Sequence, residues 1–283
     1  MKETIRILNV LVFSLVGLLS HTVFADHGIK KVIWIVLENT NVSDALKDPF
    51  LAELVQRGSL MQSMTGESHP SEPNYVAMIA GDTMGVFADD DVNLSGNHLG
   101  DLLEQKGKTW KAYAEGFPGN CFSGSTSGNY ARKHVPFISF INISQNPSRC
   151  ENIVDGTQFD QDLAAGTLPD YSMYTPDLQN DGHDTNVTFA SKFLEQKFGA
   201  LIRDADFMKD KLIVVTFDES ETYFSNNIYT VLLGGMIQPG SVATEAVNHV
   251  SLLRLIESEW NLGSLSRQDD SAVLPTGIWQ ALD

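Results

Sequence analysis

The sequence predicts an α/β fold, a three-layer sandwich with a mostly parallel central sheet, for residues 26–283. Two continuous apolar and β-branched runs, at residues 31–37 and 212–217, are typical of strands that are buried on both faces. Further strand patterns alternate with helical periodicity along the chain, which favours parallel pairing. The length suits one domain with a large core, and two small domains are the less favoured alternative.

The first half of this domain is predicted to alternate strands with short helices. After the strand at 31–37, a helix at 48–57 ends at Gly58. The later elements expected before residue 115 are a strand at 59–64, a helix starting at 74–79 with Pro73 near its first turn, a helix at 99–106 and a strand at 109–114.

Residues 115–166 are predicted to form a long insertion within the same domain. This segment is rich in Gly, Ser and Asn and lacks strong periodicity. It contains Cys121 and Cys150, the two cysteines of the chain. An even cysteine count in an exported protein predicts one disulfide, and two buried free thiols are the alternative.

Regular structure is expected to resume after the insertion. Strands are predicted at 170–174, 212–217 and 229–233, and helices at 188–203 and 249–260. The last helix is amphipathic, with Val250, Leu253, Ile256 and Trp260 on its apolar side.

The first 25 residues are predicted to be a signal peptide. Lys2 and Arg6 give a basic start, residues 7–19 are apolar, and Ala25 is a small residue at the cleavage site. The apolar run is shorter than the roughly 20 residues that span a bilayer, so a cleaved signal is favoured over an uncleaved anchor. We therefore expect a secreted or periplasmic protein without a stable membrane anchor.

The net charge of the chain indicates which classes of partner it can bind. The formal net charge is −17 at pH 7. A surface this acidic repels the phosphate backbone of nucleic acids and attracts no anionic lipid surface. We therefore expect no nucleic-acid partner.

Two polar pairs directly follow the two strongest strands. Glu38-Asn39 comes after the strand at 31–37, and Asp218-Glu219 after that at 212–217. Ligands bind beyond the carboxyl ends of strands in such sheets, and clustered carboxylates need a compensating cation. The pairs predict one divalent, oxygen-preferring metal ion, such as calcium, magnesium or manganese. Solvated side chains at strand ends are the alternative.

Ser71 precedes a predicted helix start and is the candidate nucleophile. Backbone N–H groups and the positive end of a helix dipole would stabilise its alkoxide and a phosphoryl oxygen. An ordinary helix-capping serine is the alternative. His69 and Asn74 lie on either side and add polar groups that a simple cap does not need.

Two histidines are candidates for phosphate contact or for protonation of a leaving group. His183 lies in a Gly-flanked acidic loop and His249 opens a helix, where capping is the alternative role. His98 and His134 lie in ordinary helix or loop contexts, and we expect structural roles for them.

Five stretches, in order along the chain, resemble the bacterial and fungal phosphoesterase family of secreted acid phosphatases and phosphatidylcholine-type phospholipases C, within the alkaline-phosphatase-like superfamily. They are IVLEN (35–39), HPSEPNYVAMIAG (69–81), TPDLQNDGHD (175–184), VVTFDES (214–220) and NHVSLLRLIE (248–257). The resemblance implies that Glu38, Asn39, Asp218 and Glu219 are metal ligands and that Ser71 is the nucleophile. It also implies that His183 and Asp184 lie beside the phosphate, that His249 is the family's late histidine, and that His69 and Asn74 bind substrate. The resemblance implies an alkaline-phosphatase-like fold.

The resemblance implies hydrolysis of phosphate esters through a phosphoserine intermediate. The compact chain is more similar in size to the secreted acid phosphatases, including those acting on phosphoinositides, than to the longer phospholipases C. The expected partner is a phosphorylated small molecule or a phospholipid headgroup. The alternatives are a phospholipase C acting on phosphatidylcholine-type lipids and a secreted cation-binding protein without catalysis.

Overall fold

The computed structural model describes residues 27–281. The predicted signal peptide lies outside the described residues. The part described is built around an eight-stranded sheet with the strand order β10-β2-β9-β8-β1-β7-β3-β6. Its strands are β1 Lys31–Leu37, β2 Ser59–Thr65, β3 Trp110–Ala114, β6 Ile153–Asp155, β7 Tyr171–Thr175, β8 Lys211–Phe217, β9 Thr230–Gly234 and β10 Ser241–Asn248.

The sheet is mostly parallel, as the sequence predicts. β9 runs antiparallel to both of its neighbours, β2 and β8, and the remaining pairings of this sheet are parallel. β1 lies in the middle, between β8 and β7. Six of its seven residues are buried because helices cover both faces of the sheet at this position, which explains its unbroken apolar sequence.

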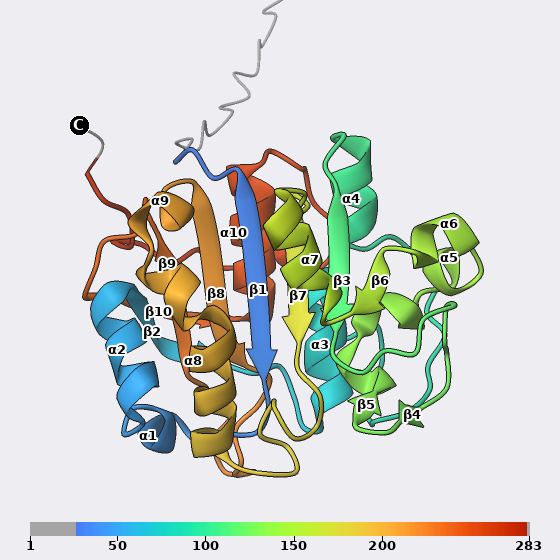
Figure 1. The fold of residues 1–283 in the computed structure, drawn as a ribbon, viewed down its shortest axis with the longest axis horizontal. Helices are drawn as coiled ribbons and strands as arrows, with labels where there is room; N and C mark the ends of the chain where they lie inside the picture. The colour runs from blue at the N-terminus through green and yellow to red at the C-terminus, as the bar shows by residue number, and fades with distance from the viewer. Residues whose placement is uncertain (1–26, 282–283) are drawn as a thin grey trace, which may run out of the picture.

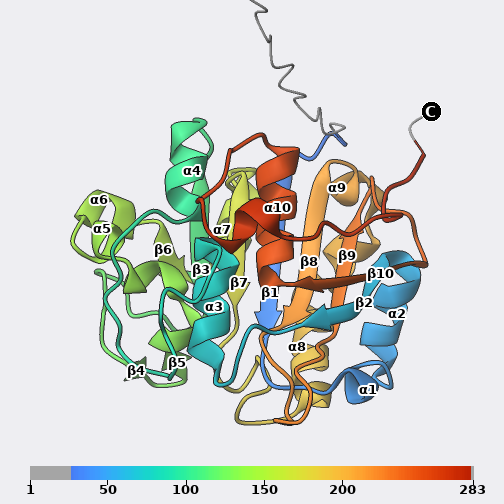
Figure 2. The ribbon, with the colours of Figure 1, turned by 180° about the vertical axis from the view of Figure 1, so that it is seen from behind.

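Helices cover the sheet on two faces and complete three layers. Figures 1 and 2 show α2, α7 and α8 on one face and α3, α4 and α10 on the other. The longer helices are α2 Pro49–Arg57, α3 Ser71–Ala80, α4 Leu99–Gln105, α7 Gln158–Ala165, α8 Val187–Arg203 and α10 His249–Glu259. The shorter ones are α1 Val42–Ala45, α5 Ile141–Ser144, α6 Pro147–Cys150 and α9 Ala205–Met208. The predicted three-layer α/β fold is confirmed.

The insertion at 115–166 is more regular than its composition indicates. It contributes β6, which pairs with β3 at the edge of the main sheet, and the helix α7. It also contains a small ribbon of β4 Thr126–Ser127 and β5 Tyr130–Ala131. Cys121 and Cys150 are joined by a disulfide. Short strands and polar turns of this kind carry little periodic signal, so the sequence does not reveal them.

The other missed strand is β10, at the opposite edge of the sheet. Its sequence SVATEAVN has no apolar residue larger than Val, and only two of its eight positions are buried. Its register with β2 also shifts between Ala243 and Ala246. An edge strand needs no continuous apolar run, because only part of one face packs against the core.

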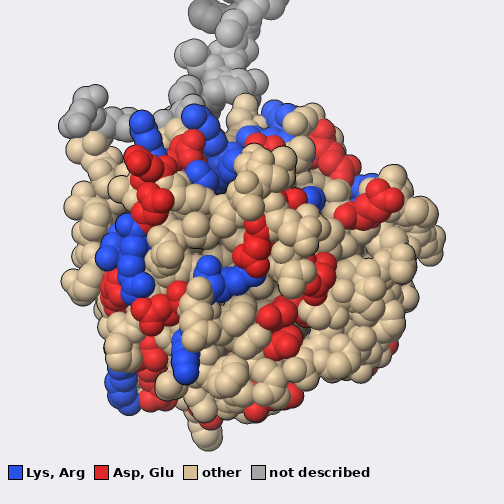
Figure 3. All heavy atoms as spheres, viewed as in Figure 1, with Lys and Arg blue, Asp and Glu red and all other residues tan. Residues whose placement is uncertain are grey.

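The surface is mixed in charge. Figure 3 shows Lys and Arg side chains interspersed with Asp and Glu over the face that carries α2 and α8. Within residues 27–281, none of the helices has the length and apolar character needed to cross a membrane.

Candidate active site

The two predicted polar pairs lie side by side at the carboxyl ends of β1 and β8. Leu37 is opposite Phe217 in the parallel register, so the residues that follow each strand meet. The backbone N–H of Asp218 donates to the carbonyl of Leu37 at 3.0 Å, and that of Asn39 donates to Asp218 Oδ1 at 3.3 Å. Figure 1 shows this end of β1 at the lower edge of the sheet, where the loop leading to α8 also lies.

Asn39 links the two pairs through its side chain. Its Nδ2 donates to Glu219 Oε1 at 3.1 Å. Its backbone has a φ of 25°, in the left-handed region that Asn tolerates better than most residues. Unusual backbone of this kind is found where a chain must aim a side chain at a functional site.

Ser71 is the first residue of α3, and its hydroxyl faces these carboxylates. The Oγ donates to Glu38 Oε2 at 2.9 Å and lies 3.4 Å from Glu219 Oε1. Pro70 occupies the N-cap position, and the helix has no side-chain cap bond. The capping alternative for Ser71 is therefore wrong, because its hydroxyl contacts the strand-end carboxylates instead of the helix backbone.

Tyr75, one helical turn after Ser71, holds the other oxygen of Glu38. Its hydroxyl donates to Glu38 Oε1 at 2.6 Å, and its ring stacks against His134 with centroids 5.0 Å apart. Residues four apart on a helix share a face, so α3 presents both hydroxyls to one carboxylate. Tyr75 was not predicted as a site residue, although its spacing of four from Ser71 places both on one face of a helix.

The insertion delivers His134 to the site. His134 Nε2 lies 3.3 Å from Glu38 Oε1, and its Nδ1 lies 3.2 Å from Asp181 Oδ2. Burial lowers the pKa of His134 well below its ordinary value, which favours the neutral imidazole that binds metal ions. The structural role predicted for His134 is therefore incomplete, because its ring lies between two buried carboxyls of the site.

Lys133, the neighbour of His134, brings a cation to the same edge. Its Nζ donates to Asp89 at 2.8 Å and lies 3.3 Å from His183 Nε2. Burial alone would lower the pKa of Lys133, but the bond to Asp89 and the charge of Glu38 outweigh it and raise the pKa. Lys133 therefore stays charged close to the carboxylates.

His183 and Asp184 also reach this edge, as predicted. His183 Nδ1 lies 2.7 Å from Asp184 Oδ1, and about a third of its side chain is exposed. The ammonium of Lys133 can only donate, so His183 Nε2 accepts and Nδ1 donates to Asp184. The backbone N–H of His183 bonds to Asp181 Oδ1 at 2.8 Å, which fixes this loop beside His134.

His249 contacts the backbone of Asp218, in the pair Asp218-Glu219. Its Nε2 donates to the backbone carbonyl of Asp218 at 2.7 Å, and its side chain is fully buried. Burial lowers its pKa to about 4, so the ring is neutral in mildly acidic solution. Asn248, not His249, caps α10, so the capping alternative is wrong. The contact fits a residue that positions the Asp218 backbone.

His69 and Asn74 have different surroundings from each other. His69 Nδ1 contacts Glu219 Oε2 at the site. The amide of Asn74 is fully buried and bonds to the backbone of residues 67–70, with Oδ1 accepting from Glu67 and Ser68 and Nδ2 donating to Ser68 and Pro70. Both polar atoms of Asn74 thus hold the loop before α3, which departs from the predicted contact with substrate.

The carboxyls of the site are crowded in a buried space. Burial raises the pKa of Glu38 well above its ordinary value, and the charges of Asp218 and Asp181 raise it further. Burial also raises the pKa of Asp181 and of Asp218 to about 8, and that of Glu219 to about 7. A cation among these groups would let them ionise together.

The donor atoms present fit such a cation. Asn39 Oδ1 and Asp218 Oδ2 are buried and have no hydrogen-bond partner among residues 27–281, and both belong to the predicted ligand set. One oxygen each of Glu38 and Asp181 and one nitrogen of His134 lie within 4.8 Å of one another and form a possible metal-binding triad. Glu38 lies in both groups, so the predicted ligands and the triad are parts of one cluster.

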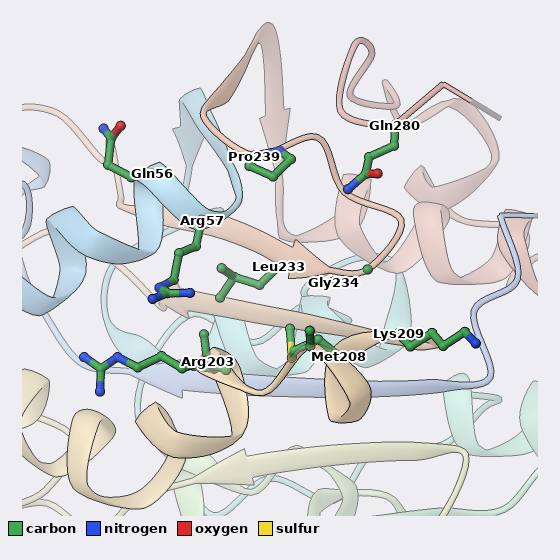
Figure 4. A pocket seen from close by; sticks show the side chains of 12 residues that line it. Gln56, Arg57, Arg203, Met208, Lys209, Leu233, Gly234, Pro239 and Gln280 are labelled. Carbon is green, nitrogen blue, oxygen red and sulfur yellow. The ribbon is translucent and has the colours of Figure 1, made fainter. Parts of the chain in front are cut away.

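A separate cavity of about 550 Å³ lies near the amino end of β8, opposite to the end that carries Asp218 and Glu219. It adjoins Gly234, which pairs with Leu212 near the start of β8. Figure 4 shows Arg57 and Arg203 lining it from the ends of two helices. Both guanidinium groups bond to Glu53, and that of Arg203 also bonds to Glu195, so two carboxylates compensate the two positive charges. Because it lies at the opposite end of β8, this cavity is separate from the cluster around Ser71.

The chain is similar in sequence to several phosphatases. A probable acid phosphatase of Kluyveromyces lactis is 36% identical over 256 residues, which cover 86% of this chain and 61% of the relative. An acid phosphatase of Aspergillus fumigatus is 36% identical, with 85% and 56% covered. The chain spans about three fifths of the length of these fungal relatives. A phosphatidylinositol-3-phosphatase of Mycobacterium tuberculosis is 30% identical, with 88% of this chain and 82% of the relative covered.

Solved structures agree on the fold. A protein of the alkaline phosphatase superfamily from Vibrio parahaemolyticus matches 87% of this chain and 70% of its own, with a TM-score of 0.61 at 14% identity. Murine ectonucleotide pyrophosphatase/phosphodiesterase 5, solved in complex with AMP, matches 86% and 100%, with a TM-score of 0.54 at 10% identity. The Phosphoesterase family profile matches residues 38–263, a span that begins at Glu38 and includes the whole cluster described above. The chain belongs to the Phosphoesterase family.

Proposed function

We propose that this protein is a secreted, metal-dependent acid phosphatase that hydrolyses phosphate monoesters through a phosphoserine at Ser71. The observation that carries the proposal is the hydroxyl of Ser71 at the start of a buried helix, between Glu38 Oε2 and Glu219 Oε1. A non-catalytic cation-binding protein has no need for a serine in that position. The phosphatase relatives support the same reaction class.

One divalent, oxygen-preferring cation would be held by Glu38, Asn39, Asp218 and Glu219. When bound, it supplies positive charge that lowers the pKa of the Ser71 hydroxyl and neutralises a phosphoryl oxygen. The free lone pairs of Asn39 Oδ1 and Asp218 Oδ2 support this ligand set.

The residues of the site have different roles in phosphoryl transfer. Ser71 Oγ passes its proton to Glu38 Oε2, which already accepts its hydrogen bond, and attacks phosphorus as the bond from phosphorus to the leaving-group oxygen breaks. Lys133 moves from His183 Nε2 to a phosphoryl oxygen. The freed Nε2 takes up a proton from solvent, contacts a phosphoryl oxygen and gives that proton to the departing alcohol. Water then attacks the phosphoserine, which releases phosphate and restores the hydroxyl. Placement and charge supply most of the acceleration, because this reaction needs little other covalent work from a protein.

The substrate we propose is a phosphorylated small molecule or the headgroup of a phosphoinositide. The phosphatidylinositol-3-phosphatase of Mycobacterium tuberculosis supports the second, since the match covers 82% of that relative. The predicted signal peptide and the disulfide between Cys121 and Cys150 support export, because disulfides persist in oxidising compartments.

The proposal is tested by measuring phosphate release from p-nitrophenyl phosphate and from a phosphoinositide, with and without a chelator. We expect release from both at acidic pH, loss of release with chelator, and recovery when a divalent cation is restored. Phosphatidylcholine should give no diacylglycerol. Release that is indifferent to chelator would contradict metal dependence, and diacylglycerol formation would favour a phospholipase C.

A further inference from the structure

The loop between β8 and β9 presents two aromatic side chains to solvent beside the active site. Tyr223 is 82% exposed and Phe224 is fully exposed. Large apolar side chains at the tip of a loop gain nothing from folding, so their surface is available to a ligand. The loop begins directly after Asp218 and Glu219, which ties its position to that of the acidic pair.

Hydrogen bonds hold both ends of this loop. Ser220 Oγ donates to the carbonyl of Thr222 at 2.8 Å, and the backbone N–H of Ser220 donates to Asn226 Oδ1 at 2.9 Å. Asn226 Nδ2 in turn donates to the carbonyl of Ser68 at 2.9 Å. Glu221 Oε2 also accepts a hydrogen bond of 3.2 Å from Nδ2 of Asn41, which precedes α1. The tip is thereby fixed relative to the segment that leads to Ser71.

Tyr223 contacts the site through His69. The two rings lie with their centroids 4.6 Å apart and their planes tilted by 42°. His69 Nδ1 contacts Glu219 Oε2, and the other oxygen of Glu219 faces Ser71. A short chain of contacts thus connects the exposed ring of Tyr223 to the nucleophile. Phe224 directly follows Tyr223, but within the described residues its ring contacts no other aromatic ring.

The edge of the site therefore offers two kinds of surface. Lys133 and His183 provide charge and hydrogen bonds, which suit the phosphoryl group of an ester. Tyr223 provides a flat aromatic face, which suits a planar or apolar group and adds little for a small polar alcohol. A phosphate monoester has both parts, a charged phosphoryl group and the alcohol that leaves.

We propose that Tyr223 contacts the leaving group and makes the enzyme prefer phosphate monoesters of aryl or other planar, apolar alcohols. The inference rests on the proposed phosphatase function and, of the two substrates proposed there, favours a phosphorylated small molecule over a phosphoinositide headgroup, whose leaving group is a polyhydroxylated ring. Tyr223 acts in binding the ester, whereas Ser71 carries the phosphoryl transfer. Its removal should therefore raise KM for such esters and leave kcat nearly unchanged.

The test compares Tyr223→Ala with Tyr223→Phe and Phe224→Ala on two substrates, phenyl phosphate and glycerol 2-phosphate. We expect Tyr223→Ala to lower kcat/KM for phenyl phosphate about threefold to tenfold, through KM, with little change for glycerol 2-phosphate. Tyr223→Phe keeps the ring and should behave as the wild type. Phe224→Ala is the matched control and should leave both substrates unchanged. Inhibition by inorganic phosphate, which has no leaving group, should be the same in all four proteins.

Three outcomes would overturn the inference. These are an equal loss on both substrates, no loss on either, or a loss on phenyl phosphate from Phe224→Ala in place of Tyr223→Ala. An equal loss with weaker phosphate inhibition would assign Tyr223 to the support of His69. If the wild type releases phosphate from neither ester, the proposed function itself fails and this inference with it.

Discussion

Tyr75 donates a 2.6 Å hydrogen bond to Glu38 Oε1, while Ser71, one turn earlier on α3, donates to Oε2 of the same carboxylate. A fully buried helix thus fixes both oxygens of a fully buried glutamate. The orientation of Glu38 is set by the protein before any cation or substrate arrives. Such preorganisation is what phosphoryl transfer requires of a site.

The first prediction concerns this hydrogen bond. Tyr75→Phe keeps the ring packed against His134 but leaves Glu38 Oε1 without its donor. Loss of a group that orients a metal ligand typically costs about 10- to 100-fold in metal affinity or activity. We expect a reduction in that range, measured by cation titration and by kcat/KM.

Tyr171→Phe is the matched control for this variant. The Tyr171 hydroxyl is also buried but has no hydrogen-bond partner in the part of the chain that the structure describes, so its removal should leave metal affinity and activity unchanged. Equal metal affinity in Tyr75→Phe and the wild type would show that Glu38 does not need Tyr75 for its orientation.

The second prediction separates the two groups of candidate ligands that share Glu38. Asp218→Asn removes a charge from the predicted ligand set, and Asp181→Asn removes one from the set with His134. We expect Asp218→Asn to lower metal content and activity together, and Asp181→Asn to have the smaller effect on metal content. Both are measured by elemental analysis after dialysis against a defined cation concentration. Metal loss from Asp181→Asn alone would place the ion between Glu38, His134 and Asp181.

The third prediction is a pH dependence of stability in the chelated protein. Burial raises the pKa of Asp181 and of Asp218 to about 8, from an ordinary value of 3.8. Between these values the native state binds more protons than the unfolded state, so the free energy of unfolding falls as pH rises. The stability is fully present below about pH 4 and is lost as pH rises through about 8.

Thermal unfolding at a series of pH values measures this dependence. The Tm of the chelated protein should fall by several degrees between about pH 5 and pH 8, and Asp218→Asn should fall less over the same range. A saturating divalent cation should remove most of the fall, because it compensates the ionised carboxylates. A chelated protein that gains stability over that range would contradict the buried, uncompensated state of these carboxyls.

Much of the fold follows from the sequence because its central strands are buried on both faces. The predicted strand at 31–37 matches β1 residue for residue, and that at 212–217 matches β8 within one residue. β6 and β10 could not be predicted, because edge strands bury too little to require apolar runs. The helix predicted from residue 74 begins three residues earlier, at Ser71.

The candidate site was predictable where strand ends determine position. Glu38, Asn39, Asp218 and Glu219 meet because β1 and β8 are parallel neighbours. Lys133 and His134 come from a segment without periodicity, and their location depends on how the insertion folds back over α3. No local sequence pattern predicts how the insertion folds, so only the tertiary structure shows that these two residues lie at the site.

The fourth prediction concerns the disulfide that closes this insertion. Cys121 and Cys150 are 29 residues apart in sequence, and Lys133 and His134 lie between them. The double variant Cys121→Ser/Cys150→Ser should lose about 2–4 kcal/mol of unfolding free energy, because its unfolded chain is less constrained. Activity should fall as well, since the loop that carries both site residues is held less firmly.

Denaturant unfolding and kcat/KM measure the two effects. A reductant should reproduce both losses in the wild type and change neither quantity in the double variant. Full activity and stability in the double variant would show that packing alone holds the insertion in place.

The fifth prediction tests the central claim, that Ser71 carries the phosphoryl group during turnover. The measurement is an acid quench of the enzyme during hydrolysis of p-nitrophenyl phosphate, followed by proteolysis and mass spectrometry of the peptide containing Ser71. We predict a phosphate adduct on Ser71 in the wild type, and in Ser71→Ala neither an adduct nor turnover, with phosphate still bound. Near-normal turnover by Ser71→Ala, or a wild-type adduct on a different residue, would contradict the account.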